Sequence, residues 1–122
     1  MQAAAVAASS KKAESIVILD VSKQLVITDH FLICNGNTDR QVKSIADEVV
    51  KVLSTESGVK PFRREGEREG RWVLLDYVDF VVHVFHKEDR EYYDLERLWS
   101  DAPVIEFDDP WEQADERSRA AT

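Results

Sequence analysis

The histidines and aspartates near residue 80 are the side chains of this chain best suited to chemistry. His83 and His86 are three residues apart in a run that alternates like a β-strand, so they point to opposite faces and cannot share a metal ion. Asp76 and Asp79 have the same spacing around an expected turn, where aspartate usually serves the turn itself. The only cysteine, Cys34, lies in an apolar run without an evident histidine partner. These patterns predict no catalytic residue, no metal site and no cofactor.

A second candidate site is the turn from Asn35 to Asn37, which precedes a predicted helix. The free N–H groups at the start of a helix can bind phosphate. One glycine is a weak signal, however, no P-loop lysine follows, and Asp39 places a negative charge where the anion would sit. Thr38 and Gln41 have the spacing of a capping box, which favours an ordinary helix start. A nucleotide-binding or residual nucleotidyltransferase enzyme is the alternative function that this turn would serve.

Residues 71–86 are predicted to form the β-hairpin that positions most of these side chains. A two-residue loop at Val78 and Asp79 decides which residues share a face, because side chains alternate along each strand. One face is then wholly apolar and is expected to be core: Tyr77 faces Phe80, Leu75 faces Val82 and Val73 faces Val84. The opposite face, termed the mixed face, pairs Asp76 with Val81, Leu74 with His83 and Trp72 with Phe85. Such a surface is either covered by another element or docks a partner.

Composition describes an acidic chain with a moderate core. Its 122 residues, 43% hydrophobic and 33% charged, fit one compact domain. The net charge of −8 repels bare nucleic acid, so we expect no direct DNA binding, and it attracts a basic protein. One cysteine allows no intramolecular disulfide, and no run approaches the ~18 apolar residues of a membrane span. We predict a cytoplasmic protein without membrane association.

Hydrophobic periodicity along the chain predicts an α/β fold with one mixed β-sheet packed by helices. We expect strands at 16–21, 31–34, 59–63, in the hairpin and at 103–107, and helices at 39–54 and 90–99. Tyr92, Leu95, Leu98 and Trp99 recur at core spacing and should pack on the sheet. Residues 1–107 are predicted to be a single domain that begins with a short, frayed helix over 1–14, and 108–122 an acidic, flexible tail.

Several segments occur in an order and spacing that is highly specific when they are taken together: Ile18–Ser22, Thr28–Ile33, Arg40–Asp47, Glu65-Gly66, Trp72–Tyr77, Val81–His83 and Arg90–Trp99. In these segments the chain resembles the ribosomal silencing factor family (RsfS, or Iojap-like) over roughly residues 13–107. Val78 stands where the family usually has glycine, and His30 where it tends to have tyrosine. Because a β-branched residue disfavours positive φ, we expect a longer or bulged hairpin loop at Val78.

The resemblance implies a nucleotidyltransferase-like core that lacks the catalytic acids. No Asp-x-Asp pair lies on a predicted strand, which agrees with that implication. The resemblance also implies a homodimer that binds the fourteenth protein of the large ribosomal subunit (the L14 family). Binding there would stop the small subunit from joining and silence translation when nutrients are short. An interaction adaptor unrelated to ribosomes remains a further alternative.

We expect the partner-binding residues to lie mainly on the mixed face. Trp72 is the expected anchor, because interfaces favour buried aromatic residues. Asp76 and His83 are expected to orient the partner, with Leu74 and Phe85 as the apolar surround. Core packing is the alternative role for Trp72 and His83. Two further residues, Glu65 and Tyr77, come from the resemblance alone, and the hairpin pairing places Tyr77 on the core face.

Overall fold

Six strands form one mixed sheet in the computed structural model, which describes residues 1–107. The chain order is α1 (Gln2–Ser10), β1 (Glu14–Asp20), β2 (His30–Gly36), α2 (Asp39–Ser57), β3 (Arg63–Glu65), β4 (Trp72–Asp76), β5 (Phe80–His86), α3 (Lys87–Tyr93), α4 (Leu95–Leu98) and β6 (Val104–Ile105). The sheet order is β3-β4-β5-β2-β1-β6, with β2 and β5 parallel and all other neighbours antiparallel. The predicted α/β fold with a mixed, helix-packed sheet is therefore confirmed. The acidic tail predicted over 108–122 lies outside the described residues.

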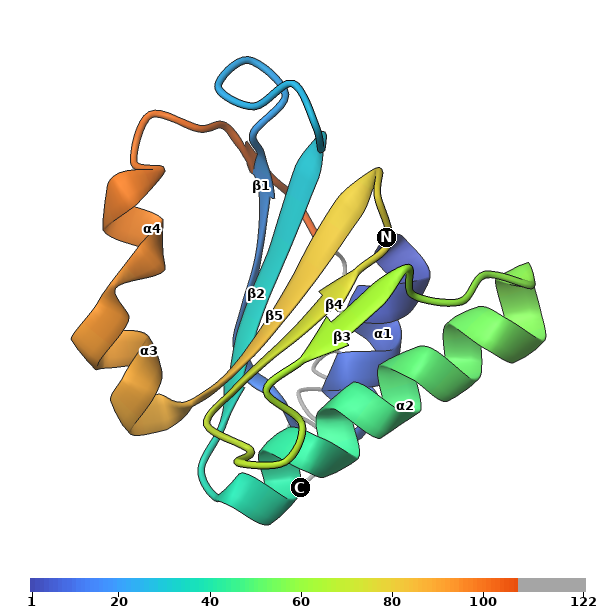
Figure 1. Cartoon of the computed structure of the whole chain (residues 1–122). Coiled ribbons are helices and arrows are strands. Elements are labelled where there is room, and N and C mark those ends of the chain that lie inside the picture. The colour runs from blue at the N-terminus through green and yellow to red at the C-terminus, as the bar shows by residue number, and fades with distance from the viewer. Residues whose placement is uncertain (108–122) are drawn as a thin grey trace, which may run out of the picture.

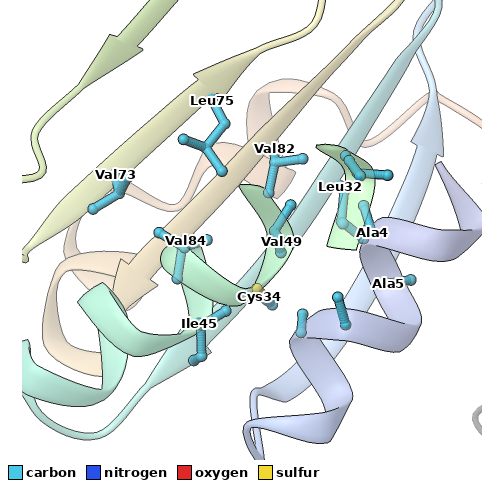
Figure 2. Close-up of a cluster of buried hydrophobic side chains, with 14 of the residues drawn as sticks. Ala4, Ala5, Leu32, Cys34, Ile45, Val49, Val73, Leu75, Val82 and Val84 are labelled. Carbon is cyan, nitrogen blue, oxygen red and sulfur yellow. The ribbon is translucent and has the colours of Figure 1, made fainter. Parts of the chain in front are cut away.

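The helices lie on both faces of the sheet (Figure 1). Helices α1 and α2 cover one face, whereas α3 and α4 lie against the other. The larger core fills the α1–α2 side and draws on the hairpin, β2 and both helices, with Val73, Leu75, Val82, Val84, Leu32, Cys34, Ile45, Val49, Ala4 and Ala5 all fully buried (Figure 2). The apolar face predicted for the hairpin is therefore core.

Helix α2 begins where the sequence predicts. The Gln41 N–H donates to Thr38 Oγ1 at 3.1 Å, and the Gln41 side-chain oxygen accepts from the Asn37 N–H at 2.7 Å. The helix continues to Ser57, three residues beyond the predicted end, and stops at Gly58 in the left-handed region (φ 64°). Helix α1 is packed rather than frayed, because its buried alanines are small enough to let it lie close against α2.

The structure gives different bounds to the strand predicted at 59–63 and to the helix predicted at 90–99. The strand expected at 59–63 begins only at Arg63, since Pro61 has no N–H to donate to a neighbouring strand. The helix expected at 90–99 begins at Lys87 and breaks at Asp94, whose φ is 48°. The break interrupts the helical period, so Leu95 and Trp99 pack on the sheet while Tyr92 and Leu98 face solvent. The prediction that Tyr92 and Leu98 are core residues is wrong.

The hairpin has the predicted register: Trp72 pairs with Phe85, Leu74 with His83 and Asp76 with Val81. Its loop is two residues long, because the Tyr77 N–H donates to the Phe80 carbonyl at 2.9 Å. The longer or bulged loop expected at Val78 is therefore wrong. Val78 instead adopts φ 73°, and its N–H donates to Asp76 Oδ1 at 2.8 Å. The side chain of Asp76 thus supports a turn that valine disfavours.

Candidate partner-binding site

The mixed face divides into two halves. The covered half, Trp72 and Phe85, packs against residues of the α3–α4 segment. The open half, Leu74, Asp76, Val81 and His83, lines a groove of about 360 Å³. The β1–β2 connection also lines this groove through Leu25, Ile27 and Thr28, and Phe31 lines it from the start of β2. The remaining lining residues are Phe62, Arg63 and Val78. The mixed face is thus covered in one half and open in the other.

Trp72 and Phe85 form a layered aromatic stack in the covered half. The Trp72 ring stacks on Phe85 with centroids 4.7 Å apart and lies 5.0 Å from the ring of Tyr93. Phe85 is 0% exposed, so it supports Trp72 from beneath and offers a partner no surface. The backbone beside Trp72 requires a glycine at position 66. A Cβ there would lie 1.9 Å from the Trp72 carbonyl oxygen, and the φ of Gly66 is 80°.

His83 connects the two halves. The Trp72 indole N–H donates to His83 Nδ1 at 3.2 Å. The rings of Phe31 and His83 pack in a T-shaped arrangement with their centroids 4.8 Å apart. Burial lowers the pKa of His83 from 6.5 to about 4, so the side chain is neutral at pH 7. With Nδ1 as the acceptor, the proton lies on Nε2. His83 therefore presents one N–H donor in an apolar setting.

Arg90 fastens the α3–α4 segment to the sheet. Its Nη1 donates to the Ser15 carbonyl at 2.7 Å and to Asn35 Oδ1 at 2.9 Å, and its Nε donates to Glu96 at 2.8 Å. The guanidinium thereby joins α3 and α4 to β1 and β2. Sequence reasoning did not assign this role, although Arg90 lies in one of the segments that carry the family resemblance. Nothing in its local spacing indicates which strands it reaches.

Exposed apolar side chains surround the mouth of the groove. Ile27 is 81% exposed, Phe62 is 80% exposed, and Val78 is also exposed. An apolar groove with an apolar rim is typical of a surface that a partner covers. Sequence reasoning missed Ile27, Thr28 and Phe62 as groove residues. Only a bulky aromatic directly after Pro61, outside any apolar period, could have indicated Phe62.

The remaining predicted site residues have different positions. Asp76 lies at the groove, where its second carboxylate oxygen is 3.8 Å from Arg63. Glu65 is exposed on β3, within 3.4 Å of Arg63, and does not line the groove. Tyr77 lies on the core side of the sheet, buried, and burial raises its pKa. The structure thus brings Leu74, Asp76 and His83 together at the groove, Trp72 borders it, and Tyr77 is separated from it by the sheet.

The groups with potential for metal binding, nucleophilic chemistry or phosphate binding have the following environments in the described residues. Across residues 1–107 no three His, Cys, Asp or Glu side chains converge as a metal site. Burial raises the pKa of Cys34 to about 12, which leaves its thiol unreactive near neutral pH. At the turn before α2, Thr38 and Gln41 already occupy the N–H groups of Gln41 and Asn37, so fewer donors remain for a phosphate. No helix within this part of the chain is long and apolar enough to cross a membrane.

A six-stranded mixed sheet with helices on both faces defines a small α/β domain. The chain belongs to the ribosomal silencing factor family, whose model, described as "Ribosomal silencing factor during starvation", matches residues 1–122. Ribosomal silencing factor RsfS of Bacillus subtilis is 48% identical over 108 residues, which are 88% of this chain and 91% of that protein. The family predicted from the sequence is therefore confirmed.

Two further comparisons extend this relationship. A crystal structure from Bacillus halodurans superposes with a TM-score of 0.76 at 47% identity, and covers 87% of this chain and 95% of its own. The mouse protein named "Mitochondrial assembly of ribosomal large subunit protein 1" is 29% identical over 101 residues, which are 81% of this chain and 43% of that protein. The fold is thus shared with a solved bacterial relative, and the sequence similarity extends to a mitochondrial protein.

Proposed function

We propose that this protein is a translational repressor that binds the fourteenth protein of the large ribosomal subunit and blocks association with the small subunit when nutrients are limiting. It acts in the cytoplasm, as a homodimer and without catalysis. Membership of the silencing factor family supports the ribosome as the target. The name of the mouse relative, which concerns the large subunit, supports the choice of subunit.

The open half of the mixed face is the observation that carries the proposed docking site. Its groove is apolar, its rim exposes Ile27 and Phe62, and its floor contains His83 as a neutral N–H donor. The chain carries a net charge of −8, which speeds encounter with a basic protein. Trp72 contributes from the border of the groove, where its indole holds His83 in place.

Co-sedimentation with isolated ribosomal subunits tests this proposal. Phe62→Ser removes an exposed aromatic at the groove, and Tyr92→Ser removes one on α3; the two side chains are 80% and 82% exposed, which makes them a matched pair. We expect the wild type to bind large but not small subunits, Phe62→Ser to bind at least about tenfold more weakly, which corresponds to ~1.4 kcal/mol, and Tyr92→Ser to bind normally. Failure of the wild type to bind large subunits at low salt would contradict the proposal. Weak binding by Tyr92→Ser alone would move the contact to α3.

A photoreactive residue in place of Phe62 identifies the partner. Irradiation of the complex should cross-link it to the fourteenth protein of the large subunit, which mass spectrometry of the product would detect. Cross-links to other ribosomal proteins alone would refute that partner. Sedimentation equilibrium of the free protein tests the proposed homodimer independently.

A further inference from the structure

The floor of the groove contains two polar atoms without partners. Among residues 1–107, three buried side-chain polar atoms have no hydrogen-bond partner: Thr28 Oγ1, His83 Nε2 and the hydroxyl of Tyr77. Thr28 and His83 line the same groove, from the β1–β2 connection and from β5. Folding leaves such groups unpaired at a cost, because water satisfies them in the unfolded chain. Two of the three therefore lie at the groove.

The chemistry of this pair is directional. The Trp72 N–H fixes His83 Nδ1 as an acceptor, so Nε2 carries the proton and can only donate. Thr28 Oγ1 can donate or accept. The surrounding lining from Leu25, Phe31 and Leu74 is apolar. An oxygen acceptor carried next to an apolar group would satisfy this floor.

The two loops beside the groove each carry an aspartate. Asp29 and Asp79 lie in these loops, and the Asp29 N–H donates to the Asp79 carbonyl at 2.9 Å, which holds the loops together. Among the residues that line the groove, the carboxylate of Asp76 lies 3.8 Å from Arg63, so Asp29 and Asp79 carry the unpaired negative charge beside the groove. A basic segment complements this negative charge.

We propose that the groove receives an apolar side chain from a basic protein segment, and that an oxygen of this segment accepts a hydrogen bond from His83 Nε2 and pairs with the Thr28 hydroxyl. This inference rests on the proposed function and names how the same site recognises its ribosomal partner. Both atoms are covered in the free protein, so docking includes a rotation of lining side chains. Thr28 and His83 are thus specificity residues: their side-chain polar atoms lack hydrogen-bond partners in the free protein and gain them from the bound segment.

Thr28→Val separates this role from a structural one, because valine keeps the shape and removes the hydroxyl. We expect the variant to unfold at a higher urea concentration than the wild type, yet to bind large subunits at least tenfold more weakly. Thr28→Ser should restore binding, and Thr55→Val, on the exposed face of α2, should leave it unchanged. Unchanged or tighter binding by Thr28→Val would overturn the inference while the proposed function stood.

His83→Asn is the second test and remains decisive if Thr28→Val does not fold. Asparagine can place an acceptor near the position of Nδ1 for Trp72 but has no donor at the position of Nε2. Binding at least tenfold weaker than that of the wild type would support the inference, and wild-type affinity would overturn it. Absence of binding by the wild type in the same gradients would instead refute the proposed function.

Discussion

Trp72 and Phe85 at one end of the mixed face lie under the α3–α4 segment, whereas Leu74 and Asp76 at the other end line a groove. The two ends belong to the same pair of strands and follow the same alternation. At the covered end Arg90 binds α3 and α4 to β1 and β2, and Leu95 and Trp99 pack on the sheet, whereas the loop end of the hairpin lines the groove. Strand alternation therefore assigns side chains to a face, and contacts between residues distant in sequence decide which of those side chains are covered.

Removing the Phe85 ring should lower the free energy of unfolding more than any other change to the mixed face. Phe85→Ala deletes a fully buried ring beneath Trp72 and should lower the free energy of unfolding by about 3–5 kcal/mol. Leu74→Ala in the open half should lower it by less than about 2 kcal/mol, because Leu74 is only half-buried. Urea unfolding followed by tryptophan fluorescence measures both. Equal losses would mean that the two halves are equally packed.

Acidification should destabilise the protein through His83. Its pKa is lowered to about 4 in the folded state from an ordinary 6.5. Between these two pH values His83 is therefore protonated in the unfolded chain and neutral in the folded chain. Stability from this residue is complete above pH 6.5 and is lost as the pH falls to 4, by about 3 kcal/mol. The other charged residues that line the groove of His83 are Asp76 and Arg63, which lie 3.8 Å apart as an ion pair.

Urea unfolding between pH 7 and 4 measures this loss, with His83→Asn as the control because it cannot titrate. The wild type should lose about 3 kcal/mol more than the variant over this range. Parallel pH profiles for the two proteins would contradict the buried, neutral state of His83.

Relaxing the hairpin loop should have a smaller, stabilising effect at the open end. Val78 has φ 73°, a conformation that glycine adopts without steric cost. Val78→Gly should raise the free energy of unfolding by about 1 kcal/mol, since relief of strain exceeds the added freedom of the unfolded chain. Val59→Gly, at an exposed position without positive φ, is the control and should not stabilise. A destabilised Val78→Gly protein would show that the valine side chain contributes packing there.

The rim of the open half should contribute least to stability. Ile27→Ser and Phe62→Ser replace exposed side chains and should change the free energy of unfolding by no more than about 0.5 kcal/mol. Chemical denaturation of both variants measures this. Losses above about 2 kcal/mol would place the rim in the core and remove it as a docking surface.

Local signals were sufficient to predict the hairpin register and the Thr38 cap, because alternation and capping depend on neighbours in sequence. They failed at Val78 and Asp94, which adopt positive φ although neither is glycine. The mixed face was predicted, but its division was not, since the reach of Arg90 spans more than 50 residues of sequence. Thr28 and Phe62 join the groove from separate loops, and no spacing in the sequence indicates that they meet.

A subunit-joining assay tests whether the protein keeps the two ribosomal subunits apart. Large subunits are incubated with increasing protein, small subunits are added, and the fraction of joined ribosomes is read from light scattering or sucrose gradients. We expect that joining falls as the wild type saturates the large subunits, that Tyr92→Ser acts like the wild type, and that Phe62→Ser requires at least about tenfold more protein. Undiminished joining by large subunits already saturated with the wild type would contradict the proposed function.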